Sequence, residues 1–354
     1  MRAAVVALVL LLIGSVAPAR AQDPSSSRGP DHKLTYSDTA MGTTVSVWIW
    51  TDDEVHAATG AHAVFEEMKR LDTVMTTWVR AGVPPSEVVQ INQASGVAPV
   101  VVSDETYAVI ARALDVSKRS GGVFDITVGA FAGLWKFDEE MDGTLPDPAD
   151  VKKRLAMIGW KDVVLDPAKH SVFLKRKGMA ITLGGIAKGY AVDRCVKILV
   201  DAGFVDFMVQ AGGDMYISGA KGADPWMVAI RDPRGTRDAQ FAVAPITNHS
   251  FSTSGDYERG FVKDGVRYHH ILDPRNGQPA HASRSVTIRA KDAFTADAWS
   301  KVMFIYGWRE GMDIIKREKL EDFEAVWVDD KNEIHKTAEI GKTLKIVKNP
   351  TPGP

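Results

Sequence analysis

The sequence predicts a mixed α+β fold with largely antiparallel sheets flanked by helices. Alternating apolar segments, rich in β-branched and aromatic residues, recur along the chain with turn signals between them. Amphipathic helical segments lie in clusters among these strands, and the absence of a regular strand–helix–strand repeat disfavours a doubly wound sheet. Because no shift in composition marks a boundary, we expect one domain over residues 34–349, which is long enough to form two lobes that share a cleft.

The composition is that of an ordinary globular protein. The chain has 354 residues, of which 45% are hydrophobic and 25% charged, and its formal net charge is -2. This balance gives no general attraction to nucleic acid or anionic membranes, so any phosphate-binding site must be local. The single cysteine, Cys195, excludes an internal disulfide and a cysteine-rich zinc site, and its amphipathic surroundings favour a buried apolar role.

The first 21 residues have the pattern of a secretory signal peptide. Arg2 precedes an apolar stretch over residues 3–16, and Ala-Arg-Ala at 19–21 forms a cleavage site. The apolar stretch is short for a membrane span, and no cysteine follows it for lipid attachment. We therefore expect an exported, soluble, periplasmic protein without a stable membrane span. A flexible lead-in over residues 22–33 and a tail over 350–354 would flank the domain.

The first half of the domain starts with a strand and is then mainly helical. Residues 42–50, "GTTVSVWIW", alternate as a strand does. Residues 52–75 have helical apolar spacing behind two aspartates, and residues 103–122 have a helical pattern between an acidic cap and a Gly-Gly stop. We expect a loop over 76–96 and a short helix over 147–160.

The second half is richer in strands. A hairpin is expected over 171–185, followed by a helix over 186–204. Helices over 294–303 and 307–320 precede a closing hairpin over 326–336. The remaining strands are expected at 206–219, 226–232, 241–246, 268–273 and 285–290.

A glycine-rich turn precedes the helix that starts near residue 187. Gly184 and Gly185 allow the backbone to approach a ligand, and the helix N-terminus offers N–H groups to an anion. Lys188 adds a positive charge in the first helical turn. The spacing matches neither a dinucleotide-binding fingerprint nor a Walker A loop, so a tight structural turn with an exposed lysine is the alternative.

Further polar residues gather at turns. Asp125 lies beside aromatic residues and Asp214 follows a Gly-Gly pair, and each is also a residue type common in turns. The densest polar segment contains His269, His270 and Asp273. Since neighbouring residues of a strand point to opposite faces, at most one of the two histidines can face a given site. His270 is either an acid–base group or a hydrogen-bonded strand residue.

Asp297 and Lys301 are four residues apart on a predicted helix, so their side chains meet on one face. One interpretation is a surface ion pair worth about 0.3 kcal/mol. The other is that Asp297 binds a metal such as Mg²⁺, which prefers hard oxygen ligands. The spacing alone does not decide between them.

Read in order, these stretches resemble the ApbE family of FAD:protein FMN transferases, from about Met41 to Gly307. The resemblance is carried by "MGTTVSV", "MTTW", "SGGVFDITVGAFAGLWKF", "LGGIAKGYAVD", "QAGGDMYISG", "SGDYERGFVKDGVRYHHILDPRNGQPA" and "TADAWS". It implies an ApbE-like fold with a flavin-binding cleft. It also implies a transferase that moves FMN from FAD to a Thr or Ser hydroxyl of an acceptor flavoprotein and releases AMP.

The resemblance also implies roles for individual residues. His270, Asp273 and Lys188 would be catalytic. Gly185 and Asp297 would bind Mg²⁺, with Ser300 as a further candidate ligand. The residues implied to contact FAD are Met41, Trp78, Val123, Phe124, Asp125, Thr182, Lys188, Asp214, Ser254, His270 and Ile271.

Two positions depart from the family pattern. Asn276 replaces a common threonine in the H-x-x-D-P element, and Asn can still form turn hydrogen bonds. Lys301 stands where the family usually has a threonine metal ligand, and an ammonium cannot ligate a cation. Lys301 could point outward and leave a weaker metal site, or its ammonium could replace one role of Mg²⁺. The protein could instead be a flavin-binding accessory protein without efficient transfer, or an FAD pyrophosphatase.

Overall fold

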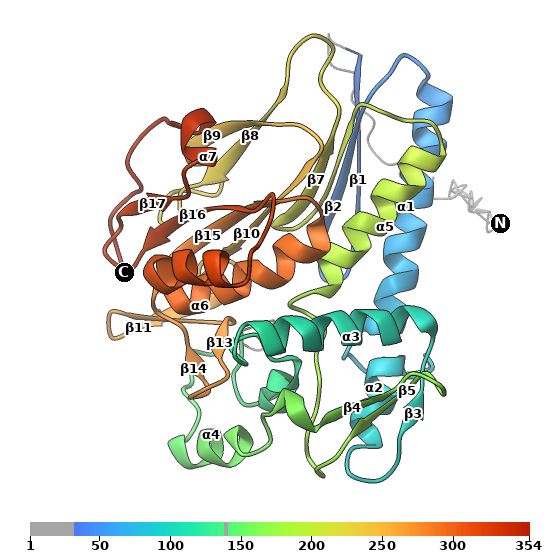
Figure 1. Cartoon of the computed structure of the whole chain (residues 1–354), viewed down its shortest axis with the longest axis vertical. Helices are drawn as coiled ribbons and strands as arrows, with labels where there is room; N and C mark the ends of the chain where they lie inside the picture. Colours follow the sequence, from blue (N-terminus) through green and yellow to red (C-terminus); the bar gives the residue numbers. More distant parts are fainter. Residues whose placement is uncertain (1–31, 138–140) are drawn as a thin grey trace, which may run out of the picture.

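The fold is α+β, as predicted, and every strand pairing among the described residues is antiparallel. A computed structural model describes residues 32–137 and 141–354 (Figure 1). The predicted signal peptide, residues 1–21, and the lead-in through residue 31 lie outside the described residues. The chain enters the fold at Lys33, the first residue of a strand.

The largest sheet has eight strands in the order β1-β2-β6-β7-β10-β15-β16-β17. Its members are β1 (Lys33–Ala40), β2 (Thr43–Trp50), β6 (Phe207–Ala211), β7 (Asp214–Ser218), β10 (His249–Gly255), β15 (Ser283–Ala290), β16 (Glu324–Asp329) and β17 (Ile334–Lys336). Both faces of this sheet are buried. In β16, Val326 and Val328 join one hydrophobic core while Trp327 joins another, as the two-residue period of a strand requires.

Three long helices pack on one face of this sheet and supply much of the main core (Figure 1). They are α1 (Glu54–Met75), α5 (Ala187–Asp201) and α6 (Ala293–Arg317). The two helices predicted over 294–303 and 307–320 form the single element α6, which is kinked at Gly307 because this residue has a φ of 77°. A kink at glycine is a common way to redirect a helix.

A small sheet covers the other face of the large one, and its apolar side chains form a second core there. Its strands are β8 (Trp226–Arg231), β9 (Gln240–Ile246) and β18 (Lys345–Ile346), with β9 in the middle. The short helix α7 (Ile340–Thr343) precedes β18. The helices, the large sheet and the small sheet therefore form three layers.

A second group of elements lies below α6 in Figure 1. Its helices are α2 (Glu87–Gln93), α3 (Asp104–Arg119) and α4 (Pro148–Leu155), with the 3₁₀ turns η1 (Ile126–Phe131) and η2 (Trp160–Asp162). Its strands are β3 (Val100–Val101), β4 (Val163–Asp166) and β5 (Ser171–Leu174). Two further hairpins join β11 (Gly260–Lys263) to β12 (Val266–His269), and β13 (Leu272–Asp273) to β14 (Gln278–Pro279).

Several local predictions were wrong. The predicted hairpin over 171–185 is not formed, because β5 pairs with the upstream strand β4 and no strand follows it before residue 186. Strands β1 and β10 and helix α2 were not predicted. The segment predicted as one strand over 206–219 is the pair β6–β7, which turns at Gly212 with a φ of 61°. The strand predicted over 268–273 is divided between β12 and β13.

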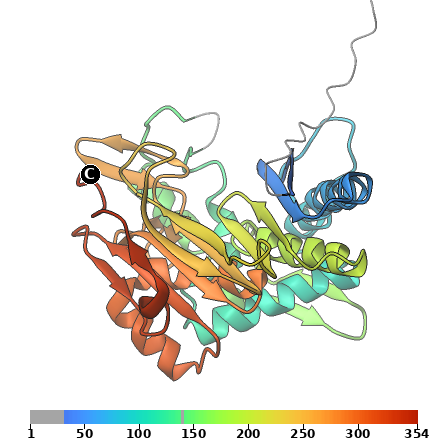
Figure 2. The same ribbon diagram turned by 90° about the horizontal axis from the view of Figure 1, so that it is seen from above.

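The predicted tail, residues 350–354, is held against the domain. The Thr351 backbone N–H and hydroxyl both donate to Asp232, and the Pro350 carbonyl accepts from Asn332. Arg267 of β12 donates to the main-chain oxygen of Pro354, and in Figure 2 the β11–β12 hairpin lies beside this end of the chain. Among residues 32–137 and 141–354, no helix combines the length and the apolar character needed to cross a membrane.

Candidate active site

The close crossing of α5 and α6 is the scaffold of the site. A Cβ added to Gly189 would lie 2.2 Å from the Ala293 carbonyl oxygen and 2.6 Å from the Cβ of Asp297. These distances are shorter than any normal contact, so only glycine lets the two helices approach this closely. The sequence signal for this close crossing is a glycine inside the predicted helix over residues 186–204, and the crossing was not predicted from it.

Each of the two helices caps the N-terminus of the other. Asp193 of α5 accepts the backbone N–H groups of Ala293 and Phe294, which are the first two residues of α6. Asp297 of α6 accepts the N–H of Gly189, in the first turn of α5, at 2.8 Å. These carboxylates satisfy N–H groups that a helix N-terminus otherwise leaves open, and they interact favourably with the helix dipole. The reciprocal caps fix Asp297 at the start of α5.

Asp297 is fully buried, and both of its carboxylate oxygens have partners. Oδ2 accepts the Gly189 N–H, and Oδ1 accepts the ammonium of Lys301. Burial by itself would raise the pKa of Asp297. The charges of Lys188 and Lys301 and the hydrogen bonds outweigh burial and hold this pKa below its usual value. Asp297 is therefore an anion at neutral pH.

A second ion pair lies beside the first. Lys188, in the first turn of α5, donates to Oδ2 of Asp214, the first residue of β7. Burial opposes the charge of Lys188, but the carboxylates of Asp214 and Asp297 outweigh it and raise its pKa. Oδ1 of Asp214 is buried without a hydrogen-bond partner among the described residues. The two pairs form a cluster of alternating charge, which we call the charged cluster: Lys188, Asp214, Asp297 and Lys301.

His270 and Arg259 approach the charged cluster from the β11–β12 hairpin. The His270 side chain is exposed, but protein surrounds its ring closely enough that burial lowers its pKa, and the charges of His269, Arg259 and Lys301 act in the same direction. His270 is therefore neutral at pH 7. Its Nδ1 lies 3.3 Å from the Arg259 carbonyl oxygen, which can only accept. Nδ1 thus carries the proton, and the lone pair is on Nε2.

The two neighbouring histidines have different roles, as the strand pattern predicts. His269 is buried, and its Nε2 donates to the Ala280 carbonyl at 2.7 Å while its Nδ1 accepts the Ile271 N–H. Burial is the main cause that lowers the pKa of His269 to about 4. Both ring nitrogens of His269 are used within the fold, so His270 is the histidine available to a ligand.

The glycine turn lies directly against the charged cluster. A Cβ on Gly185 would lie 3.3 Å from Cε2 of Phe124 and 4.0 Å from Cε of Lys301. The turn is held by Thr182, whose N–H donates to the Ile126 carbonyl and whose hydroxyl accepts the Gly184 N–H at 3.3 Å. The turn, the start of α5, Phe124 and two ammonium groups thus meet in one place, which is suited to a phosphate-bearing ligand.

Comparison with known proteins identifies the family. The sequence model that describes the ApbE family matches residues 41–327 of this chain. The chain belongs to the ApbE family. It is 35% identical to the FAD:protein FMN transferase of Treponema pallidum (strain Nichols), over 73% of this chain and 75% of that protein.

Other members of the ApbE family are similarly related. Identity to an FAD:protein FMN transferase of Klebsiella pneumoniae (strain 342) is 33%, over 83% of this chain and 88% of that protein. The crystal structure of the ApbE protein of Thermotoga maritima matches with a TM-score of 0.79 and 34% identity. This match covers 88% of this chain and 99% of that one. The predicted family and the predicted ApbE-like fold are confirmed.

Some predicted site residues already have partners within the fold. Asp125 caps η1 by accepting from Thr127, and its other oxygen accepts the Trp160 N–H. Asp273 is paired with Arg275, which donates to both of its oxygens. Both carboxylates fix the backbone around the site, and their predicted roles toward a ligand stay predictions.

Other predicted ligand contacts differ in exposure. Val123, Phe124 and Ile271 are buried in the main core. Trp78 lies between α1 and α2 with 62% of its surface exposed. Met41 forms the β1–β2 turn with Gly42 and has a φ of 52°, a left-handed conformation that costs energy in a residue other than glycine. Strain of this kind is found more often at functional sites than elsewhere, which agrees with the predicted contact to FAD.

The predicted magnesium ligands do not fit a divalent cation. Mg²⁺ requires near-octahedral oxygen coordination, and a cation at Asp297 would lie in contact with the Lys301 ammonium, which repels it. Oδ1 carries the ammonium of Lys301, and Oδ2 accepts the Gly189 N–H. Lys301 does not point outward, since its side chain is only 18% exposed. The carbonyl of Gly185 would be left without a carboxylate partner at this position.

The hydroxyl of Ser300, the further candidate ligand, is also engaged in hydrogen bonds within the fold. It donates to the Asp297 backbone carbonyl at 2.7 Å and lies 2.7 Å from the hydroxyl of Ser254. Because Ser300 donates its proton to the carbonyl, Ser254 is the donor in the second contact. The pair is buried and ties β10 to α6. Ser254 and Ser300 therefore stabilise the packing of β10 against α6 next to Asp297.

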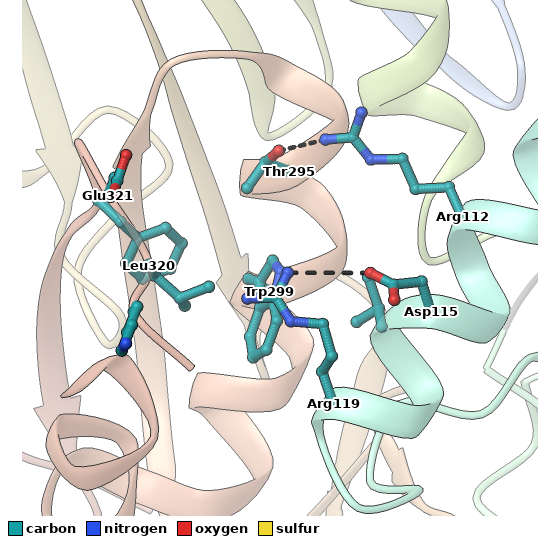
Figure 3. Close-up of a pocket in the computed structure, with 10 residues that line it drawn as sticks. Arg112, Asp115, Arg119, Thr295, Trp299, Leu320 and Glu321 are labelled. Atoms are coloured by element: carbon teal, nitrogen blue, oxygen red, sulfur yellow. Dashed lines mark hydrogen bonds and ion pairs between the residues drawn. The ribbon is translucent and has the colours of Figure 1, made fainter. Parts of the chain in front are cut away.

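A separate hollow of about 200 Å³ lies between α3 and α6 (Figure 3). Its rim is charged, with Arg112 donating to Thr295 and the Arg119 guanidinium lying 5.2 Å from the Trp299 ring centre. None of the predicted site residues lines it. The hollow is therefore distinct from the charged cluster.

Proposed function

We propose that this protein is an exported FAD:protein FMN transferase. It would move the FMN half of FAD to a Thr or Ser hydroxyl of an acceptor flavoprotein and release AMP. Membership in the ApbE family and the names of its relatives support the transferase activity. The signal-peptide pattern over residues 1–21 supports export to the periplasm, with residues 34–349 as the catalytic domain.

The observation that carries the proposal is the charged cluster at the glycine turn. Lys188 and Lys301 lie where the start of α5 and Gly185 meet, and the charge of Arg259 reaches Lys188 and His270. Cationic groups and a helix N-terminus together bind a pyrophosphate and stabilise charge that develops on it. Trp78 and Met41 would contact the flavin or adenine parts of FAD, since an exposed indole is suited to stacking on a ring.

The proposed reaction is an in-line phosphoryl transfer. The acceptor hydroxyl oxygen attacks the FMN-side phosphorus, and the bond from that phosphorus to the bridging oxygen breaks. AMP leaves with the bonding electron pair on that oxygen, and FMN is left as a phosphoester on the acceptor. Nε2 of neutral His270 takes the hydroxyl proton, while Nδ1–H remains bonded to the Arg259 carbonyl. Lys188 neutralises charge on the departing phosphate.

Asp273 would position this machinery. Its carboxylate accepts the Arg275 backbone N–H and the Arg275 side chain, and its carbonyl accepts the N–H groups of Asn276 and Gly277. These bonds fix the turn that follows His270. Asn276 itself caps the turn, because its side-chain oxygen accepts the Gln278 N–H at 2.8 Å.

The test is to incubate the mature protein with FAD and a candidate acceptor domain and to measure the intact mass of the acceptor. A mass gain of one FMN on a Thr or Ser, with AMP in equal amount, is expected. Free FMN and AMP without labelling would indicate an FAD pyrophosphatase. Stable FAD binding without AMP release would indicate an accessory flavin-binding protein. Either result would exclude the transfer proposed here for that acceptor, and a His270→Ala variant provides the inactive control.

A further inference from the structure

The Lys301 ammonium is bonded to Oδ1 of Asp297, one of the two oxygens through which this carboxylate would bind a metal ion. We propose that the Lys301 ammonium takes the place of a divalent cation at this site, so that the phosphate-binding centre of this protein works without a bound metal. The proposal depends on the proposed function only for the identity of the phosphate ligand. The position of the lysine is a property of the protein itself.

The first argument is geometric. Lys301 lies one helical turn after Asp297 on α6, and its ammonium is bonded to Oδ1 of that carboxylate. Its Cε is 4.0 Å from the position of a Cβ on Gly185, so the side chain lies over the glycine turn. An ammonium has three N–H donors, and one is used by Asp297. Two remain to donate to phosphate oxygens held by the turn.

The second argument concerns charge. The ammonium groups of Lys188 and Lys301 balance the carboxylates of Asp214 and Asp297, so the charged cluster is neutral before a ligand binds. A divalent ion at Asp297 would either lie beside the Lys301 ammonium or displace it, and it would also face Lys188, whose charge acts on Asp297. Repulsion between such charges at contact distance is strong in a buried site. The site therefore favours an ammonium over Mg²⁺ at Asp297.

The consequence is a different dependence on conditions. A lysine cannot be removed by a chelator, so phosphate binding and the proposed transfer would continue in EDTA. The single positive charge polarises phosphate less than a divalent ion does, and Lys188 and Arg259 would supply part of the remaining stabilisation. Replacing Lys301 by threonine would free Oδ1 of Asp297 and add a hydroxyl oxygen, both of which are suitable ligands for Mg²⁺ or Mn²⁺.

The test measures Mn²⁺ binding by the loss of the free-ion electron paramagnetic resonance signal, with and without FAD. The proteins are the mature wild type, Asp297→Asn, Lys301→Thr, Lys301→Thr/Asp297→Asn and Lys197→Thr. Lys197 is the matched control, because it also pairs with an aspartate four residues away but on the surface. Thermal melting checks that each variant is folded, and Asp297→Asn shows whether any ion bound by the wild type depends on Asp297.

We expect the wild type and Lys197→Thr to bind no stoichiometric Mn²⁺ at this site. Lys301→Thr should bind one ion per chain, at least about tenfold more tightly than the wild type, because a like charge is removed at contact distance. This binding should disappear with Asp297→Asn, which separates it from binding to carboxylates elsewhere.

Stoichiometric, Asp297-dependent Mn²⁺ binding by the wild type would overturn the proposal. So would a folded Lys301→Thr that binds no more tightly than the wild type. A failure of FMN transfer with the expected Mn²⁺ results would reject the proposed function and leave the assignment of Lys301 intact.

Discussion

Two ion pairs in this protein have the same charges and the same helical spacing, yet they differ in almost every other respect. Lys197 and Asp201 on α5 are 64% and 60% exposed, and they bond only to each other among the pairs described here. Asp297 and Lys301 on α6 are 0% and 18% exposed. Asp297 also caps α5, and Lys301 lies over the glycine turn. Spacing brings the charges together, and the packing around them decides what they do.

The difference follows from where each helix face lies. The face of α5 that carries Lys197 is open to water, where a pair contributes about 0.3–0.5 kcal/mol. The face of α6 that carries Asp297 is pressed against α5 by Gly189, so its carboxylate leaves water entirely. A buried carboxylate must be paired and hydrogen-bonded. The second pair is therefore part of the architecture as well as of the site.

Replacing Asp297 or Asp201 by alanine in separate variants should give the largest difference in the free energy of unfolding. Asp297→Ala leaves the Lys301 ammonium and the Gly189 N–H without their partner, and we expect it to lower the free energy of unfolding by about 3–5 kcal/mol. Asp201→Ala should change it by less than about 0.5 kcal/mol. Urea unfolding of both variants measures the difference. Equal, small effects would show that Asp297 is only half of an ordinary surface pair.

The buried His269 and an exposed histidine should show the same contrast in the pH dependence of stability. His269 has its pKa lowered to about 4 from 6.5, chiefly by burial. Between these values the unfolded state binds one more proton than the folded state, so stability is full above pH 6.5 and falls as the pH approaches 4. The slope is at most about 1.4 kcal/mol per pH unit.

The measurement is urea unfolding of the wild type and His269→Gln at pH 7 and pH 4.5. The variant should lack this part of the acid-induced loss of stability. His62→Gln, at an exposed histidine, is the control and should follow the wild type. A parallel pH dependence of His269→Gln and the wild type would contradict the buried, neutral role of His269.

The helix crossing itself can be disturbed without touching a charge. A Cβ on Gly189 would lie 2.2 Å from the Ala293 carbonyl oxygen, whereas at Gly184 its nearest neighbour would be the Thr182 hydroxyl at 3.5 Å. Gly189→Ala should therefore lower the free energy of unfolding by about 1–3 kcal/mol, despite the gain in helix propensity. Gly184→Ala should leave stability nearly unchanged. Chemical denaturation tests both, and a stable Gly189→Ala would show that the crossing is looser than described.

The smallest effect is expected at Trp78, outside both ion pairs. Its side chain is 62% exposed, so Trp78→Ala should leave stability unchanged within about 0.5 kcal/mol. Loss of stacking should raise the Kd for FAD by roughly 2- to 12-fold, the equivalent of about 0.5–1.5 kcal/mol. Flavin fluorescence titration measures this change. An unchanged Kd would remove Trp78 from the set of flavin contacts.

The long helices and the apolar strands were predictable, because periodicity reflects which face is buried. Strand β10 was not, since its Ser250, Ser252 and Ser254 suggest a turn although all three are buried. The hydroxyls of Ser250 and Ser254 have long-range partners, the Met215 carbonyl and the Ser300 hydroxyl, and no sequence pattern encodes such partners. Helix α2 was hidden within a segment rich in turn residues and has only seven residues.

The site residues also divide into those that a sequence pattern predicts and those that long-range packing determines. The glycine turn and Lys188 followed from a motif, and strand alternation predicted that at most one of His269 and His270 faces a given site. The direction of Lys301 did not, because a flexible lysine stem can point to water or inward, and only the α5–α6 crossing decides. Asp193 was missed as well, since its function is to cap a helix 100 residues away in the sequence.

The decisive measurement is the initial rate of FMN transfer to an acceptor domain in excess EDTA, compared for the wild type, Lys301→Thr and Lys197→Thr. If the Lys301 ammonium does the work of a metal ion, the wild type and Lys197→Thr keep their rates in EDTA. Lys301→Thr then becomes dependent on added Mg²⁺. Loss of wild-type transfer in EDTA, with recovery on adding Mg²⁺, would contradict the account.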